Sequence, residues 1–382
     1  MLDTVVLTLP EKDFFIRHGD RFTPAAGFLQ NPMYGTNQMV KAVYNPTKAE
    51  KRAGYKPRLT LIKRPFTERL KAIFLRIEFS APKMLYGNNF VELRGHDDFM
   101  PVLTALHTAL TSMGIEVALE TLKTANVSAI HYSKNILLER ETPCFLLIRE
   151  LEKLDLSAKL DLTQTDFRNS GQMVKYHAST YEIALYDKVK DLQQARIYGD
   201  KRSAEIDNAH QLDLLNSLKL PEVLRYEVRL KSKKLKPLLT KIGHAGPLTF
   251  QNLFNASLSR AILLHFWNQI TDGLYLLNLN SDDPAALIAR IKTAYPKKRQ
   301  TSILQLIGFA HTAEKLGIRG AKLHLGLNNQ TFYRLKKDLK ALDGTHTTPR
   351  FSVLKAVKEQ IIEFIPLIAD DVVKTDLLKT EN

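Results

Sequence analysis

Tyr186 and Lys188 lie two residues apart in a short stretch, residues 182–188, whose apolar side chains alternate with other residues. This alternation is typical of a half-buried strand. Successive side chains of a strand point to opposite faces of a sheet, so Tyr186 and Lys188 share one face. An ammonium group beside a phenol favours the phenolate and can also hold an anionic phosphate. The pair therefore predicts a tyrosine nucleophile that attacks a phosphate diester, although an ordinary surface pair has the same spacing.

Three further polar groups, Glu78, His131 and Glu227, lie on other predicted strands, each opposite an apolar face. A sheet that helices cover on one side leaves its other face to carry such groups together. Two carboxylates and an imidazole suit Mg²⁺ or Mn²⁺, and such an ion would polarise a phosphate oxygen for attack by the tyrosine. The alternative is that each carboxylate pairs with a neighbouring arginine: Arg76, and Arg225 or Arg229.

Other kinds of catalytic site have no motif in the sequence. It contains no glycine-rich phosphate loop of the Walker type, no cluster of cysteines and histidines with zinc spacing, and no Gly-x-Ser-x-Gly elbow. A nucleotide-driven motor, a zinc site and an acyl hydrolase are therefore not expected.

The strands that must position these groups are predicted from the alternation of apolar residues. The clearest is 223–230, and the segments 72–79 and 126–133 show similar patterns. Strands are also expected at residues 4–9, 40–44 and 58–62. An amphipathic helix that ends near Gly114 lies between the early strands. The pattern predicts an α+β fold with a central antiparallel sheet and helices.

Composition favours a polyanionic partner. The 382 residues carry a net charge of +15, and we expect the basic residues to be spread along the chain, with nucleic acid as the first candidate partner. The single cysteine, Cys144, rules out an internal disulfide framework and fits a reducing cytoplasm. We expect neither a signal peptide nor a membrane span, and hence a soluble, intracellular protein.

Beyond residue 240 the pattern changes, and nearly every segment predicts a helix. We therefore expect an α+β domain at 1–240 and an α-helical domain at 241–382. Within the second domain, helices are predicted at 300–316, 319–325 and 330–342. A helix, a glycine turn and a basic helix resemble a helix-turn-helix reader of the major groove. An ordinary helical hairpin with a solvated lysine face remains the alternative.

Several segments, in the same order along nearly the whole chain, resemble the replication initiators of filamentous phages, the gene II type. The segments that carry the resemblance are 1–10, 77–89 with its Gly-Asn-Asn turn, 184–188, 225–229 and 301–342.

This resemblance implies a rolling-circle initiator that nicks the plus-strand origin of double-stranded phage or prophage DNA and later reseals the strand. Tyr186 would form a 5′-phosphotyrosine, and Lys188 would neutralise the phosphate or protonate the leaving oxygen. Glu78, His131 and Glu227 would hold Mg²⁺ or Mn²⁺, with His131 at a position where the relatives carry an aspartate. The implied partners are the origin DNA and the helicase and polymerase of a bacterial host, in whose cytoplasm the protein would act.

Two other functions stay open at the level of sequence. A non-catalytic origin-binding protein or repressor would bind DNA without forming a covalent adduct. A plasmid relaxase would act at a transfer origin together with partner proteins.

Overall fold

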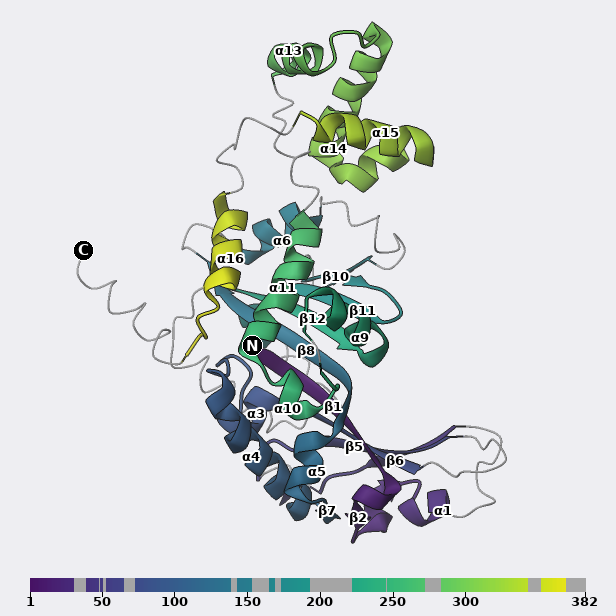
Figure 1. Ribbon diagram of the computed structural model, residues 1–382, viewed down its shortest axis with the longest axis vertical. Helices are drawn as coiled ribbons and strands as arrows, with labels where there is room; N and C mark the ends of the chain where they lie inside the picture. Colours follow the sequence, from purple (N-terminus) through teal and green to yellow (C-terminus); the bar gives the residue numbers. More distant parts are fainter. Residues whose placement is uncertain are drawn as a thin grey trace, which may run out of the picture.

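The computed structural model describes residues 1–30, 39–47, 49–50, 53–64, 73–138, 143–152, 165–168, 173–192, 222–244, 246–271, 283–342 and 352–368. Its central feature is a ten-stranded sheet in the order β3-β4-β5-β6-β1-β8-β12-β11-β10-β9 (Figure 1). Every neighbouring pair in this order is antiparallel. The expected α+β class with a central antiparallel sheet is therefore confirmed.

The strands of this sheet are β1 (Leu2–Pro10), β3 (Phe22–Thr23), β4 (Val40–Tyr44), β5 (Arg58–Lys63), β6 (Ile73–Ser80), β8 (Asn126–Leu137), β9 (Thr165–Arg168), β10 (Met173–His177), β11 (Tyr181–Asp187) and β12 (Val223–Lys231). A small second sheet pairs β2 (Phe15–Ile16) with β7 (Ile115–Glu116). Strand β1 lies in the middle of the large sheet, between β6 and β8, although it opens the sequence.

The helices are α1 (Ala26–Gln30), α3 (Ala81–Tyr86), α4 (Phe99–Ser112), α5 (Leu119–Thr124), α6 (Cys144–Glu152), α9 (Ser232–Lys241), α10 (Phe250–Leu253), α11 (Ala256–Ile270), α13 (Pro284–Ala294), α14 (Gln300–His324), α15 (Asn329–Lys340) and α16 (Ser352–Glu363). Among these described helices, none combines the length and apolar character that crossing a membrane requires.

One face of the sheet is buried against helices. Aromatic side chains make much of this contact. Phe79 of β6 meets Phe250 of α10 edge to face, with 5.7 Å between the ring centres, and Tyr226 of β12 meets Trp267 of α11 with 5.5 Å between the ring centres. Figure 1 shows α11 and α16 beside β8 and β12. This packing follows from the alternation in the strands, because every second residue is apolar and faces the helices. The polar alternate residues are left for the opposite face.

Two large hydrophobic cores, and a small cluster around Phe90 and Val223, occur in the described part of the chain. The first joins the sheet to α9, α10, α11 and α16, and the second holds α13, α14 and α15 together. The division expected at residue 240 does not separate these cores, because α9, α10 and α11 pack on the sheet and α16 returns to it after α15. The sequence pattern predicted helices beyond residue 240, which covers α10, α11 and α16 but not α9, and which core a helix joins depends on long-range packing.

Candidate functional site

The register of β8, β12 and β11 brings the predicted nucleophile to two of the predicted ligands. Tyr186 lies opposite Arg225, and Arg229 lies opposite His131. Glu227 stands between the two arginines on β12. Directly opposed residues and residues two apart point to the same face of a sheet. Tyr186, His131 and Glu227 therefore share the polar face, as the alternation of the strands predicts.

The hydroxyl of Tyr186 donates a hydrogen bond to the carboxylate of Glu227, with 3.3 Å between Oη and Oε2. The tyrosine is 6% exposed. Burial and the neighbouring charge of Glu227 raise the pKa of the phenol well above its ordinary value. The resting side chain is therefore a protonated phenol that is aimed at a carboxylate.

Glu227 is buried and surrounded by nitrogen atoms. Its Oε1 lies 3.1 Å from Nδ1 of His131 and accepts a hydrogen bond of 2.8 Å from Nε of Arg229. Nε of Arg225 lies 3.9 Å from its Oε2. Burial alone would raise the pKa of the Glu227 carboxyl, but Arg229, His131 and Arg225 hold it well below the usual range. The group is therefore an ionised carboxylate in a cationic setting.

Lys188 follows the end of β11 and is also buried, at 2% exposure. Its Nζ lies 5.8 Å from the centre of the Tyr186 ring and donates a hydrogen bond of 3.0 Å to Oδ1 of Asn89. Asp191 lies 3.5 Å away. Burial lowers the pKa of Lys188 to about 8, against the opposing charge of Asp191. The expected closeness of the ammonium and the phenol is thus present, and the ammonium is close to its titration range at neutral pH.

Arg225 belongs to the same cluster, although the sequence singled it out only as a possible ion-pair partner. It is 1% exposed, and its Nη2 lies 2.8 Å from the carboxylate of Asp3 on β1. Nη1 donates to Oδ1 of Asn135 at 3.0 Å and to the carbonyl of Asn89 at 3.1 Å. Alternation alone could not distinguish this buried arginine from a solvated one.

Glu78 lies on the same face but does not join the cluster. Strands β1 and β8 lie between β6 and β12, so three strand spacings, roughly 14 Å, separate the strands of Glu78 and Glu227. Glu78 instead pairs with Arg76 at 2.8 Å. The expected set of Glu78, His131 and Glu227 is therefore not assembled. Since Glu227 already contacts Arg229, the residues present do not fit a divalent-metal site of that composition.

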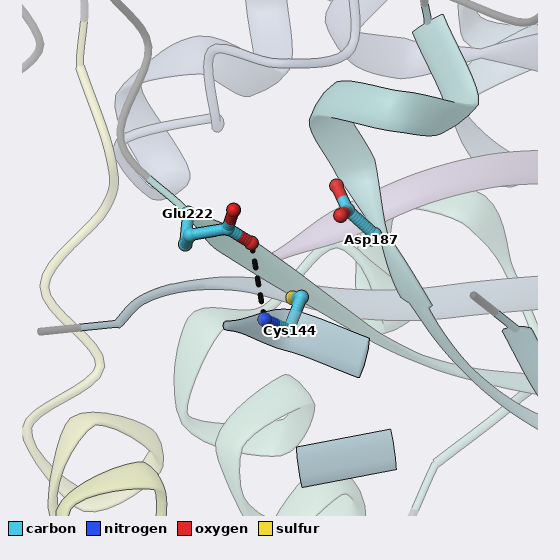
Figure 2. Close-up of side chains that lie close together, drawn as sticks. All are labelled: Cys144, Asp187 and Glu222. Atoms are coloured by element: carbon cyan, nitrogen blue, oxygen red, sulfur yellow. Dashed lines mark hydrogen bonds between the residues drawn. The ribbon is translucent and has the colours of Figure 1, made fainter. Parts of the chain in front are cut away.

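A different group of possible ligands lies at the start of α6. Figure 2 shows Cys144, Asp187 and Glu222 close together, and their ligand atoms lie within 4.8 Å of one another. Glu222 accepts a hydrogen bond from the backbone N–H of Cys144 at 3.0 Å, and Asp187 accepts one from that of Lys190 at 2.9 Å. Both carboxylates therefore already accept hydrogen bonds at helix starts. In addition, a buried thiol is a poor ligand for Mg²⁺ or Mn²⁺, which prefer oxygen.

The cluster at Tyr186 contains the groups that transesterification needs. It has a phenol, a carboxylate that can take up a proton and that an adjoining imidazole contacts, and cations that can hold a phosphate. Comparisons of the chain with protein-family models, with curated proteins and with solved structures found no match. The residues of the cluster are therefore the basis for any functional proposal.

Proposed function

We propose that the chain is a rolling-circle DNA replication initiator, a nicking and joining endonuclease that uses Tyr186 as its nucleophile. The observation that supports this proposal is the 3.3 Å hydrogen bond from the Tyr186 hydroxyl to Glu227, within a cluster that also contains Lys188 and Arg225. A phenol beside a proton acceptor and cations is suited to attack on a phosphate diester.

In the proposed step the phenolic oxygen of Tyr186 attacks phosphorus, and the bond from phosphorus to the 3′ oxygen of the preceding nucleotide breaks. The phenol proton passes to Glu227, and His131, whose Nδ1 is 3.1 Å from the carboxylate, positions this acceptor. Lys188 donates a proton to the leaving 3′ oxygen. The products are a 5′-phosphotyrosine and a free 3′ hydroxyl. The reverse step reseals the strand, so the chemistry needs no ATP.

DNA must reach Tyr186 for this step to occur. With 6% of its surface exposed, the phenol requires a local opening of the cluster. A phosphate that enters near Arg225 and Arg229 would compete with Glu227 for these cations, and so would free the carboxylate to accept a proton. Opening and activation are thereby coupled to binding of the strand.

The proposed biological substrate is a phage or prophage origin, whose free 3′ end would be extended by a host polymerase while a host helicase opens the duplex. The sequence also led us to expect Mg²⁺ or Mn²⁺. Only His131 and Glu227 of the expected ligands lie together, so no step of the proposed mechanism passes through a metal ion.

A second candidate function is non-catalytic binding of origin DNA, as in a repressor. The burial of Tyr186 and the full set of ionic partners around Glu227 favour it, since buried ionic networks also serve purely structural roles. The two candidates differ in one product, the covalent bond between tyrosine and DNA.

The experiment is capture of that adduct on a denaturing gel. The protein is mixed with a 3′-labelled, single-stranded DNA library of randomised sequence, with Mn²⁺ present, and captured strands are sequenced. We expect a covalent band from the wild type and none from Tyr186→Phe, which should still bind DNA.

Tyr181→Phe is the matched control, because Tyr181 lies on the same strand but packs against Phe266 in the core. It should keep the band. An undiminished band from Tyr186→Phe would eliminate Tyr186 as nucleophile. No band from the wild type, with DNA binding intact, would favour the non-catalytic candidate.

A further inference from the structure

The net positive charge of the chain is concentrated in one small unit where acidic residues are scarce, although the basic residues themselves are spread along the chain as expected. Residues 284–342, which contain α13, α14 and α15, have twelve lysines and arginines against two acidic residues. Their net charge is therefore +10, out of +15 for the whole chain. These helices share their own hydrophobic core. Such a density of charge on a compact unit indicates a polyanionic ligand.

The two acidic residues of this unit do not offset the charge on its surface. Asp338 is bound to Lys298, with 2.7 Å between the carboxylate and Nζ, and Glu314 is 9% exposed. The surface is thus almost uniformly cationic.

The unit contains a helix, a turn and a second helix at the positions that the sequence predicts. Helix α14 is broken at Gly317, whose φ of 76° and ψ of 162° are not helical, so a short helix follows it. That helix ends at His324, and beyond Gly326 the N–H of Leu327 donates to the carbonyl of Lys322 at 3.0 Å. Asn328 then caps α15 by accepting from the N–H of Thr331 at 2.8 Å. The three helices predicted in this region are confirmed.

Helix α15 presents two different faces. Phe332, Leu335 and Leu339 are buried in the core, and Phe332 meets Phe309 of α14 edge to face at 5.9 Å. The opposite face is exposed and consists of long polar and basic side chains: Gln330, Tyr333, Arg334, Lys337 and Lys340. It contains no acidic residue.

We propose that the unit formed by α13, α14 and α15 binds duplex DNA, with the exposed face of α15 in the major groove. The major groove is wide enough to admit an α-helix. The amide of Gln330 and the guanidinium of Arg334 are the side-chain types that read adenine and guanine edges, and Lys337 and Lys340 can hold phosphates. Arg334 is oriented by Gln305 of α14, at 3.2 Å. This binding is separate from the chemistry at Tyr186, and either can fail without the other.

Duplex DNA fits this surface better than a single strand does. Single strands are held by several aromatic side chains that stack on successive bases. The exposed face of α15 offers one aromatic residue, Tyr333, among basic side chains. We therefore expect full-length protein to prefer a duplex over either of its separated strands.

The test measures fluorescence anisotropy of the full chain with a 30-base-pair duplex of arbitrary sequence, over a range of salt concentrations. In Lys337→Gln/Lys340→Gln we expect roughly tenfold weaker binding at moderate salt. The slope of the logarithm of the binding constant against the logarithm of the salt concentration should also become shallower, by about 0.9 for each phosphate contact removed. The matched control is Lys355→Gln/Lys358→Gln on α16, which removes the same charge from an exposed helix of the sheet core.

The proposal requires the control variant to bind nearly as wild type does. Equal losses in both double variants, or no loss in the α15 variant, would overturn it, as would equal affinity for a single strand. Base reading is tested by selection from a randomised duplex library. We expect Arg334→Ala, whose folding is checked by circular dichroism, to lose a guanine preference that the wild type shows. An unchanged preference would refute the assignment of Arg334.

Discussion

The guanidinium of Arg225 lies 2.8 Å from the carboxylate of Asp3, and this ion pair joins β12 to β1 across the intervening strand β8. Asn135 of β8 accepts a further hydrogen bond from the same guanidinium at 3.0 Å. Three strands that are far apart in the sequence are thus held by one buried cation. Because Arg225 also lies beside Glu227, the structural pair and the proposed active site share this residue.

We predict that Arg225→Gln lowers the free energy of unfolding by about 3–5 kcal/mol, because it leaves the buried carboxylate of Asp3 without its cation. The measurement is urea denaturation at pH 7. Arg76→Gln is the control, since it breaks the partly exposed pair with Glu78 and should cost less than about 1 kcal/mol. Similar costs for the two variants would contradict the structural role of Arg225.

Glu92 gives a prediction about acid stability. Its carboxylate is 2.7 Å from Nζ of Lys134 and accepts hydrogen bonds from the N–H groups of Asn135 and Leu367. Although burial opposes ionisation, these partners and their charges lower its pKa from 4.5 to about 2. A lowered folded-state pKa adds stability above the unfolded value, and this stability is lost as the pH falls from about 4.5 towards 2.

We therefore expect Glu92→Gln to be less stable than the wild type by about 3 kcal/mol at pH 7, with a difference that shrinks below pH 4.5. Urea denaturation at pH 7, 5, 4 and 3 measures this. Glu359→Gln, on the exposed side of α16, should follow the wild type throughout. A difference for Glu92→Gln that does not change with pH would show that lost packing, rather than charge, causes it.

Lys188 gives a prediction for the proposed nicking reaction. Its pKa of about 8 leaves it mainly protonated at pH 7, and it loses its proton as the pH rises through 8. If it protonates the leaving oxygen, single-turnover adduct formation should fall tenfold for each pH unit above about 8. Lys188→Gln should react at least ~100-fold more slowly and should lack this fall.

The control for Lys188 is Lys190→Gln, two residues further on, which should keep both the rate and the alkaline fall. A wild-type rate that stays constant to pH 9.5 would exclude Lys188 as the acid, even if Tyr186 proves to be the nucleophile.

Local signals in the sequence predicted much of the fold. The strand expected at 223–230 is β12 at Val223–Lys231, and the helix expected to end near Gly114 is α4 at Phe99–Ser112. The helices expected at 300–316, 319–325 and 330–342 are also present, because the signals that bound them, the positive φ of Gly317 and the cap at Asn328, act within a few residues.

The relations that were not predicted are those that depend on the order of strands. Alternation gives the face on which Glu78 lies, but the two strands inserted between β6 and β12 separate it from Glu227. Likewise, the buried pairs of Arg225 with Asp3 and Lys134 with Glu92 join segments that only the folded sheet brings together. Sequence pattern indicated that these side chains are charged, not that they are paired in the interior.

The return of α16 to the sheet core has a consequence for how such a protein can change. Gln360 of α16 exchanges two hydrogen bonds with the backbone of Leu137 on β8, at 3.0 and 2.7 Å. The basic helices are consequently a cassette spliced into the chain between α11 and α16, and both flanking helices belong to the sheet core. A cassette of this kind can be replaced without rebuilding the sheet that carries Tyr186. The proposed DNA contacts of α15 and the proposed chemistry at Tyr186 can therefore change independently of each other.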